Sequence, residues 1–531
     1  MFYDSVSELS CYNLCYRRKI FLIKITFQLP RLSLKFLLHL GLIILFLTFI
    51  PRNIKGQELP GLWKSLATGI DYREFYLMDP NHLYVARMDR TNPQVTLESG
   101  IGQGKLSAGG ETVSGMASRY DQVINFWGGN WGGRNQVVVA INGYFYNTDT
   151  GVPLRGQIQS GWYAKRFDDR QNGSGFVWKL DRSAFVGGCV VHRPNKQTVS
   201  FLDQGEDIAY DGINIPRGDN TFIVYTPQFD ATTLTDDQGV EVVVELSRPM
   251  MVLSFPEMIT GIIREVRSGK GSTPIPFDHI VLSANGRIGE VLKKIAVVGE
   301  QVGIIQEIKH FESDCQTASM LSWDKSYASI GGSFNFLRNG QVQKMDDLGA
   351  LFHNARTAIA YNDRYIYFVV VDDREQFGNQ GMSIVELAFF TKDYLGATWG
   401  VAEDGGGSST MVINGVAVNK TGSADASGKD IERAVANGMM MLVVLPKEQS
   451  NAYHPGDQVI TVSTQQSPLR LGPGTNYAIL AGVEPDSVGT IQEHRNGLNG
   501  VYAKGSYWWR VAFGDSIGWI AEENLLSQNS P

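Results

Sequence analysis

Short apolar segments that alternate with turn residues run along most of this chain, and they constrain its fold more than any other feature. The clearest of them have the length and alternation of β-strands and lie at residues 84–88, 94–98, 137–141, 221–225, 240–246, 280–283, 357–361 and 365–371. The first two are expected to pair around the turn between them. Apolar residues at helical spacing occur at 109–126 and 382–393. Interleaved strands with few helices predict an α+β fold, a large, mixed, β-rich sheet domain with flanking helices, rather than a doubly wound sheet.

Size and charge limit the classes of function. The 531 residues leave room for two or three domains, and 58 glycines with 11% aromatic residues are typical of a β-rich protein with many turns. The net charge is -7 and charged residues make up 19% of the chain, without a basic stripe. Because a nucleic-acid-binding surface needs clustered positive charge, we expect no nucleic acid partner.

The N-terminal residues 1–57 are expected to be a targeting segment. Arg17, Arg18 and Lys19 precede an apolar run at 36–50, which is short for a spanning helix and typical of a signal-peptide core. The basic region before this run is long, so an uncleaved membrane anchor is the alternative. In either case the rest of the chain is predicted to be extracytoplasmic, with the membrane contacted only through this segment.

Four cysteines fit that compartment. Cys11 and Cys15 lie before the apolar run, which leaves Cys189 and Cys315. In an oxidising compartment these two could form one disulfide, and two unpaired buried thiols are the alternative. Their separation in the sequence does not decide between the two arrangements.

The composition changes near residue 447. Residues 447–457 are interpreted as a linker between a domain at 58–446 and a compact, strand-rich segment at 458–531. That segment contains Leu-Arg-Leu-Gly-Pro-Gly at 469–474 and Gly-Trp-Ile at 518–520. It resembles a bacterial SH3 domain, and the resemblance implies a small β-barrel that binds the cell wall or a carbohydrate polymer. The alternative is a domain that only packs against the main one or spaces it.

Residues 404–410, which read Asp-Gly-Gly-Gly-Ser-Ser-Thr, are the most distinctive polar stretch of the chain. Glycines let backbone N–H groups converge on an anion because no Cβ blocks the approach, and the hydroxyls and Asp404 add further polar groups. The stretch lies between a strand predicted within 396–403 and a hairpin predicted at 411–418, where Asn-Gly suits a type I′ turn. A tight turn without a ligand is the alternative. The spacing excludes a P-loop, a dinucleotide fingerprint and a nucleophile elbow.

Other polar side chains fall at the ends of predicted strands, where functional sites are commonly built. Asn142 follows the strand at 137–141, and Arg356 precedes the strand at 357–361. Asp372 and Arg374 follow the strand at 365–371, and Glu386 lies within the helix predicted at 382–393. Each of these residues could instead be a turn residue or a surface charge.

Together with the glycine-rich loop, these stretches resemble the phosphodiester glycosidase family. The family's recurring pieces are Asn-Gly-Gly-Phe-Phe, Pro-Arg-Thr-Ala, Val-Asp-Gly-Arg, a helix with Glu-Leu, Asp-Gly-Gly-Gly-Ser and Glu-Arg-Pro-Val-Gly-Asn. Their counterparts occur here in the same order, at 142–145, 355–358, 371–374, 386–387, 404–408 and 432–437. The sequence departs from the pattern at Tyr144, Ala355, Asp373 and Glu403, and none of these departures removes a charged family residue.

The resemblance implies a hydrolase that cleaves the glycosidic C1–O bond of a sugar-1-phosphodiester or a related cell-envelope polysaccharide. Such a site needs a carboxylate to stabilise an oxocarbenium-like centre, and arginine or N–H groups to hold the phosphate. The candidate catalytic residues are Asp404, Glu386 and Asp372. The candidate substrate-binding residues are Asn142, Arg356, Arg374, Gly405, Gly406, Gly407, Ser408 and Thr410.

Two rival functions stay open. A non-catalytic envelope protein would bind exopolysaccharide or peptidoglycan through both domains. A metal-dependent phosphodiesterase would need clustered histidines and aspartates, but the eight histidines are scattered without ligand spacing, and His353 is the only one near the proposed site. We therefore expect no cofactor and no metal ligands, and a divalent cation held by carboxylates is the alternative.

Overall fold

The computed structural model describes residues 62–79, 81–170, 175–312, 314–373, 380–421, 423–425, 427–428 and 430–528. Both the predicted targeting segment and Arg374 lie outside the described residues. By their contacts, residues Glu58–Pro531 form one compact unit, distinct from Met1–Gln57. Across the described ranges, we find no helix with the length and apolar character needed to cross a membrane. The linker and the domain boundaries inside the compact unit stay predictions.

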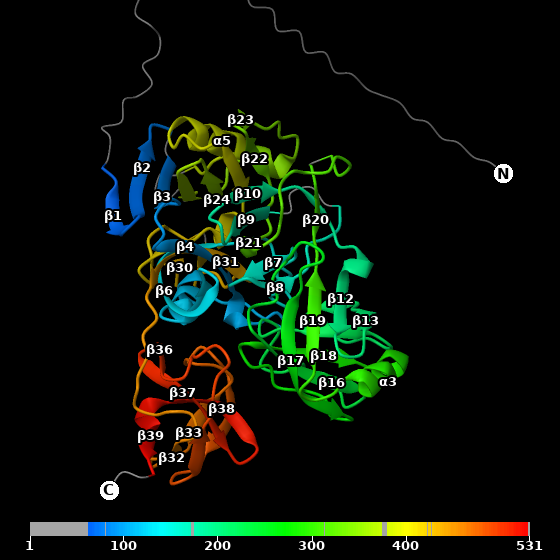
Figure 1. The fold of residues 1–531 in the computed structure, drawn as a ribbon. Coiled ribbons are helices and arrows are strands. Elements are labelled where there is room, and N and C mark those ends of the chain that lie inside the picture. Colours follow the sequence, from blue (N-terminus) through cyan, green and yellow to red (C-terminus); the bar gives the residue numbers. More distant parts are fainter. Residues whose placement is uncertain are drawn as a thin grey trace, which may run out of the picture. The chain divides into compact units, whose positions relative to one another are not determined.

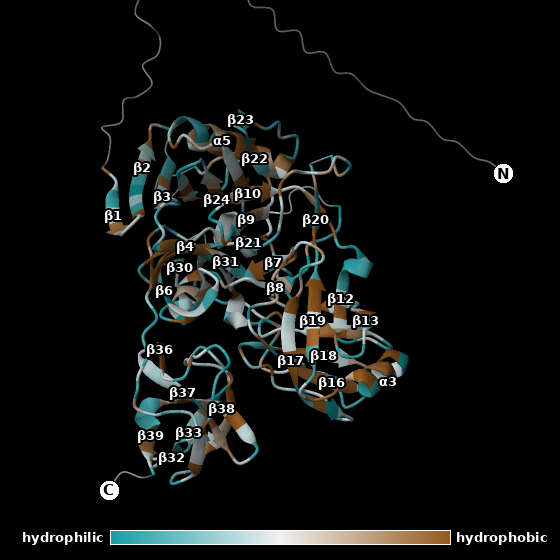
Figure 2. Cartoon of the chain, in the orientation of Figure 1, coloured by the Kyte–Doolittle hydropathy of each residue, from teal (hydrophilic) through white to brown (hydrophobic). Residues whose placement is uncertain are grey.

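Strands dominate the described part of the chain, and helices are few and short (Figure 1). The β-rich α+β fold expected from the sequence is therefore confirmed. The helices are α2 (Val113–Tyr120), α3 (Gly286–Ile295), α4 (Leu348–Leu351), α5 (Ile384–Asp393) and the 3-10 turns η1 (Gly102–Gly104), η2 (Pro194–Lys196), η4 (Gly406–Ser408) and η5 (Glu522–Asn524). In Figure 2 the hydrophobic residues concentrate on the strands, whereas the connecting loops are mostly hydrophilic.

One eight-stranded antiparallel sheet has the order β1-β2-β3-β25-β24-β26-β22-β23, with Arg356 at the start of one strand and Asp372 just after the end of another. Its strands are β1 (Lys64–Ala67), β2 (Ile70–Leu77), β3 (Asn81–Asp89), β25 (Tyr365–Val371), β24 (Arg356–Tyr361), β26 (Trp399–Ala402), β22 (Asn335–Arg338) and β23 (Gln341–Val342). Because side chains of a strand alternate between faces, Ala358 and Ala360 pack with α5, whereas Ile359 and Tyr361 pack with the neighbouring sheets. We call this sheet the site sheet.

Two further sheets pack on the face of the site sheet opposite α5. The first has the order β28-β27-β6-β31-β4, with β5 added to β6, and the second has the order β10-β9-β21-β7-β8. Their strands are β28 (Val416–Ala417), β27 (Met411–Ile413), β6 (Asn130–Asn142), β31 (Asn437–Leu445), β4 (Val95–Ile101), β5 (Ile124–Trp127), β10 (Ala184–Gly187), β9 (Gly175–Lys179), β21 (Ser326–Ile330), β7 (Gln157–Gln159) and β8 (Trp162–Lys165). The buried residues Phe176, Ile330 and Met441 join the core formed with the site sheet.

A separate eight-stranded sheet has the order β13-β12-β19-β17-β16-β18-β15-β14. Its strands are β13 (Glu206–Ala209), β12 (Gln197–Phe201), β19 (Gln301–Gln306), β17 (Ile259–Ser268), β16 (Val240–Leu246), β18 (His279–Ala284), β15 (Phe222–Tyr225) and β14 (Gly212–Ile213). Close by in the chain, β11 (Cys189–Val191) pairs with β20 (Lys309–Phe311). Cys189 and Cys315 form a disulfide there, so the first of the two alternatives left by the sequence is correct.

The C-terminal segment folds into an antiparallel sheet of its own, in the order β34-β33-β38-β37-β35-β32-β39 with β36 added to β37. Its strands are β34 (Ile479–Val483), β33 (Ser467–Arg470), β38 (Ser516–Ala521), β37 (Ser506–Phe513), β35 (Val488–Ile491), β32 (Gln458–Thr461), β39 (Leu525–Ser527) and β36 (Val501–Ala503). Trp508 and Trp519 share one hydrophobic cluster with Trp131 and Phe277 of the preceding domain. Packing therefore continues across the predicted linker.

Buried ion pairs reinforce this contact. His494 lies 2.8 Å from the Asp278 carboxylate, and Arg510 lies 3.5 Å from that of Glu245. The Lys504 ammonium donates to the backbone oxygens of Ser118 and Asp121, at 2.9 Å each. Because breaking a buried pair leaves an uncompensated charge, these contacts strongly favour one arrangement of the two parts.

Two expectations about local structure are wrong. The predicted strands at 84–88 and 94–98 exist, but β3 pairs with β2 and β25, whereas β4 pairs with β31. The turn between them thus carries the chain from one sheet to another. The helix predicted at 109–126 is only Val113–Tyr120, because Gln122 has a φ of 60° and the following apolar residues pair with β6 as a strand.

Candidate active site

Antiparallel pairing brings three predicted residues to one edge of the site sheet. Arg356 opens β24 and pairs with Val371, the last residue of β25, so Asp372 follows at this edge. Ala402, which ends β26, pairs with Ala358. Because β26 is antiparallel to β24, its continuation to Asp404 reaches the same edge.

The glycine-rich loop crosses from the site sheet to the neighbouring sheet. It leaves β26, forms the short turn η4 and enters β27, which pairs with β6. The expected hairpin follows, since Ile413 pairs with Val416 and both turn residues have positive φ, 49° at Asn414 and 82° at Gly415. The loop is therefore more than a link between adjacent strands, because it joins two separate layers.

Asn142 fixes the loop at this crossing. Its Nδ2 donates to the Asp404 backbone oxygen at 2.8 Å, and its Oδ1 accepts from the Thr410 N–H at 3.1 Å and from the Thr357 hydroxyl at 2.7 Å. The side chain is 0% exposed. Because its amide is occupied within the protein, Asn142 positions the loop, and its predicted role in substrate binding stays a prediction.

Most N–H groups of the loop are also occupied internally. Gly406 N–H donates to the Ala355 oxygen at 2.9 Å, and Ser408 N–H donates to the Gly405 oxygen at 3.3 Å. The hydroxyl-bearing residues Ser408 and Thr410 are completely buried. The predicted substrate-binding roles of Gly406, Ser408 and Thr410 stay predictions, since this conformation engages the Gly406 N–H within the protein and buries the other two residues. The roles of Gly405 and Gly407 stay predictions, since both are only half-buried.

Two further predicted residues are held by the protein itself. Asp372 is buried and accepts from the Tyr84 hydroxyl at 3.0 Å, and burial raises its pKa. Arg356 donates from Nε to the Met382 oxygen at 2.8 Å and from Nη2 to the Gly349 oxygen at 2.8 Å. Both residues stabilise this edge of the sheet, and any contact with substrate stays a prediction.

Glu386 keeps an exposed carboxylate at the start of α5. The Ser383 N–H and hydroxyl donate to Glu386 Oε2, at 2.8 Å each, while the Glu386 N–H donates to the Ser383 hydroxyl, which completes a capping box. His353 Nε2 lies 3.0 Å from the same oxygen. The Glu386 side chain is 47% exposed, so part of it is accessible to solvent.

Asp404 combines accessibility with an unusual environment. It is half-buried, and burial raises the pKa of its carboxyl. The Ser408 hydroxyl, the positive charge of Arg433 and the Gly405 N–H partly offset this effect. A Cβ built at Gly407 would lie against the Arg433 guanidinium, so the absence of a side chain there leaves room for this close approach. A carboxylate and a guanidinium thus face the same glycine loop.

Part of this chain is similar to a known protein family. Residues 280–442 match the family model of phosphodiester glycosidases. The matched span contains Arg356, Asp372, Glu386, Asp404 and Arg433, whereas Asn142 lies outside it. A search of curated proteins gave no match.

Similar solved structures are distant in sequence. A hypothetical protein from Synechocystis has 16% identity and a TM-score of 0.44, over 73% of this chain and 64% of that one. A candidate exported protein from Burkholderia pseudomallei K96243 has 20% identity and a TM-score of 0.44, over 69% and 74%. The zebrafish N-acetylglucosamine-1-phosphodiester alpha-N-acetylglucosaminidase catalytic domain, auto-inhibited by its pro-peptide, has 13% identity and a TM-score of 0.32, over 71% and 82%. The chain covers less than two thirds of the Synechocystis protein.

Sequence reasoning missed two residues of the glycosidase-like segment. Arg433 lies in the Glu-Arg-Ala-Val-Ala-Asn stretch at 432–437, a family counterpart that was recognised without being assigned to the site. Glu403 was noted only as a departure from an apolar position. It is 3% exposed, and neither of its carboxylate oxygens has a hydrogen-bond partner in the described part of the chain.

Burial without hydrogen-bond partners favours the neutral form of Glu403 in the folded protein. Burial raises its pKa well above the usual value of 4.5, and the negative charge of Asp404 adds to the effect. An ionised carboxylate without partners would be costly in this position, so the proton stays bound. The site therefore holds two adjacent carboxyl groups in different environments, one completely buried and one reachable.

The Glu403→Gln variant should be more stable than the wild type at neutral pH. Because the folded-state pKa is raised, Glu403 contributes its full stability below 4.5 and loses it as the pH rises toward the folded-state pKa. The advantage of the variant should grow by up to roughly 1.4 kcal/mol per pH unit over that window. Urea unfolding at several pH values measures it, with the exposed Glu290→Gln as control. A difference that does not change with pH would contradict the buried neutral acid.

The described residues contain one cluster with the spacing of metal ligands, formed by Glu245, Asp278 and His494. Each carboxylate already has partners within the protein: His279 and His494 contact Asp278, and Arg510 contacts Glu245. These pairs hold Asp278 ionised and its pKa far below the usual value despite burial. The cluster is explained as an ion-pair network between the domain and the C-terminal segment.

Proposed function

We propose that this protein is an extracytoplasmic hydrolase that cleaves the C1–O bond of a sugar-1-phosphodiester or a related envelope polysaccharide. The observation that carries the proposal is the match of residues 280–442 to phosphodiester glycosidases, with Asp404 and Arg433 at one glycine loop inside that span. Substrate identity rests on the chemistry of these groups and on the family, not on the distant structural likenesses.

The reaction needs little help from an acidic side chain, because phosphate is a good leaving group. As the C1–O bond breaks, its electron pair moves to the phosphate oxygen and positive charge develops at C1 and the ring oxygen. The Asp404 carboxylate would stabilise that positive charge, and the Arg433 guanidinium would stabilise the departing phosphate. Water then supplies the new C1–O bond and releases one proton. Glu386, whose side chain is 47% exposed, is a second candidate carboxylate.

Hydrolysis in water labelled with heavy oxygen tests the proposal. A panel of sugar-1-phosphodiesters and cell-wall polymers is incubated with the full chain, and mass spectrometry determines which product carries the heavy oxygen. Label on the sugar hydroxyl is expected, because the C1–O bond breaks. Label in the phosphate would overturn the proposal in favour of P–O cleavage, and binding without turnover across the panel would favour a non-catalytic binding protein.

The location and the C-terminal segment are parts of the same proposal. The Cys189–Cys315 disulfide supports an extracytoplasmic location, because such bonds persist mainly in oxidising compartments. The signal-like N-terminal pattern agrees with it. The separate antiparallel sheet of the C-terminal segment, together with its sequence motifs, supports an SH3-like barrel that contacts a cell-wall or carbohydrate polymer.

A further inference from the structure

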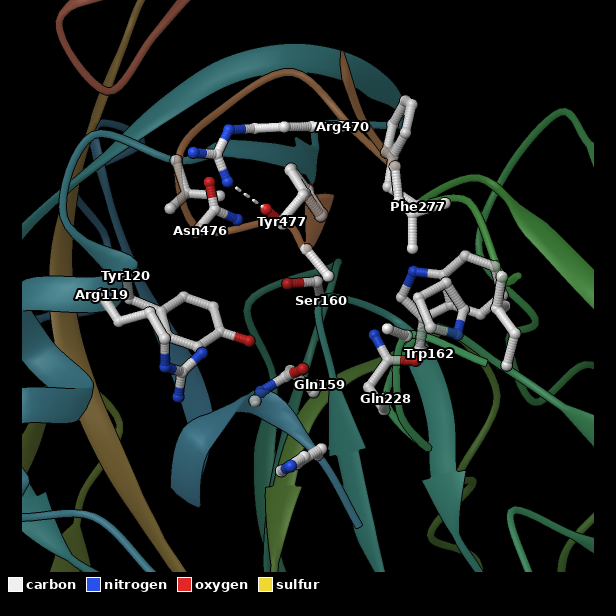
Figure 3. Close-up of a pocket in the computed structure, with 18 of the residues that line it drawn as sticks. Arg119, Tyr120, Gln159, Ser160, Trp162, Gln228, Phe277, Arg470, Asn476 and Tyr477 are labelled. Carbon is white, nitrogen blue, oxygen red and sulfur yellow. Dashed lines mark hydrogen bonds between the residues drawn. The ribbon is translucent and has the colours of Figure 1, made fainter. Parts of the chain in front are cut away.

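A cavity of about 470 Å³ lies between the C-terminal segment and the preceding domain. Figure 3 shows Arg470 and Asn476 on one side of it, and Gln159 and Gln228 on the other, with Tyr120 beside them. None of the predicted active-site residues lines it. Its volume falls within the roughly 300–1,000 Å³ typical of small-ligand sites. We call it the interface cavity.

The lining of the interface cavity combines aromatic faces with amide groups. The aromatic members are Tyr120, Trp131, Trp162, Phe277 and Tyr477, and the amide members are Gln103, Gln159, Gln228 and Asn476. Aromatic rings offer flat apolar surfaces, on which the C–H face of a sugar ring can pack. Amides both donate and accept hydrogen bonds, as sugar hydroxyls do. This combination suits a saccharide better than a purely apolar ligand.

Several buried polar atoms of the lining have no partner in the described part of the chain. They are Trp131 Nε1, Arg470 Nε and Asn476 Oδ1. The whole Trp131 residue is only 7% exposed. An unpaired buried polar group costs about 1–3 kcal/mol, and a ligand that supplies the missing hydrogen bonds would remove that cost. The interface cavity therefore has space for a ligand, and unpaired polar atoms lie within the residues that line it.

The charges around the interface cavity point to an acidic ligand. Arg119 pairs with Glu111 at 3.0 Å, and Lys105 approaches Asp230 at 3.8 Å. Arg470 instead donates from Nη1 to the Tyr477 backbone oxygen at 2.8 Å, and no described carboxylate lies within 4.0 Å of it. A half-buried guanidinium without a carboxylate partner is suited to bind an anion, because charge-assisted hydrogen bonds are the stronger ones.

The walls of the interface cavity are held together by direct contacts between the two parts. The Phe277 N–H donates to the Leu471 oxygen at 3.0 Å, close to Arg470 in the chain. The buried His494–Asp278 pair, at 2.8 Å, reinforces the same junction. A site whose walls are already fixed loses little entropy on binding, which favours affinity.

We propose that the interface cavity binds an acidic saccharide, with a sugar ring against its aromatic residues and a carboxylate or phosphate group on Arg470. This binding is independent of hydrolysis at Asp404. It gives the C-terminal segment a part in ligand recognition without requiring that segment to bind alone, because each side of the interface cavity supplies some of the contacts.

Calorimetric titration of the full chain tests the proposal. The probes are a glucuronate oligosaccharide, a neutral oligosaccharide of the same length, glucose 1-phosphate and inorganic phosphate. The glucuronate oligosaccharide or glucose 1-phosphate should bind, and which of the two binds more tightly identifies the acidic group. The neutral oligosaccharide and inorganic phosphate should bind at least tenfold more weakly. The neutral oligosaccharide lacks the acidic group, and inorganic phosphate lacks the sugar ring.

Variants of the lining make the test specific. Arg470→Gln should weaken binding of the acidic saccharide about tenfold or more, since a charge-assisted hydrogen bond is lost. Asn476→Asp keeps the side-chain volume and should weaken the same binding by charge repulsion. This second variant keeps the test decisive if Arg470→Gln does not fold. The control Arg495→Gln removes the same charge from an exposed position of the same segment and should change nothing.

Three results would overturn the proposal. The first is absence of binding for both acidic saccharides. The second is equal affinity for inorganic phosphate, which would leave only an anion site. The third is an unchanged affinity in both Arg470→Gln and Asn476→Asp. Because none of these measurements uses turnover, failure here is distinguishable from failure of the proposed hydrolysis.

Discussion

Replacing Asp404 by asparagine should lower kcat on a sugar-1-phosphodiester by about 1,000-fold or more. The substitution keeps the side-chain shape but removes the negative charge that would stabilise the developing positive charge at C1. Steady-state assays on the substrate found in the labelling experiment measure it. Asp363→Asn, at an exposed turn of the same sheet, removes the same charge and should leave kcat unchanged.

The same variant should fold at least as stably as the wild type. Burial raises the pKa of Asp404, which means that its charged form is disfavoured in the folded protein. Removing the charge at neutral pH should therefore leave the free energy of unfolding unchanged or raise it slightly. Full retained activity in a folded variant would exclude Asp404 from the reaction, whereas a large drop in stability would make the activity loss uninformative.

Loss of the Cys189–Cys315 disulfide should lower the free energy of unfolding by about 4 kcal/mol. The bond closes a loop with a sequence separation of 126 residues, so it restricts the unfolded chain strongly. Urea unfolding with and without reductant measures the effect. The double variant Cys189→Ala/Cys315→Ala should match the reduced wild type and should not respond to reductant. Equal unfolding midpoints of oxidised and reduced wild type would contradict the prediction.

The positions of strands could be predicted from the sequence, but their partners could not. Residues 84–88 and 94–98 show the apolar alternation of half-buried strands, and both are strands in the structure. Alternation identifies which side chains share a face, and it carries no information about which strand lies alongside. The turn between β3 and β4 therefore looked like a hairpin connection, whereas it leads from one sheet to the next.

The location of the candidate site followed from motifs, but the roles of individual residues did not. Polar residues at strand ends can point to solvent or into the protein, and the sequence does not distinguish the two. Asn142 and Asp372 turned inward, where they satisfy backbone and side-chain groups of their neighbours. Arg433 was missed because its approach to Gly407 depends on how two distant loops fold together.

The shared core between the C-terminal segment and the preceding domain has a consequence for how such proteins can be recombined. Domains joined by a free tether can be exchanged between proteins as independent parts. Here Trp508 and Trp519 lie in one hydrophobic cluster with Trp131 and Phe277, and His494 lies 2.8 Å from the buried Asp278 carboxylate of the other part. A transplanted copy of the segment would need counterparts of Trp131, Phe277 and Asp278 in its new host, so the two parts are expected to be inherited together.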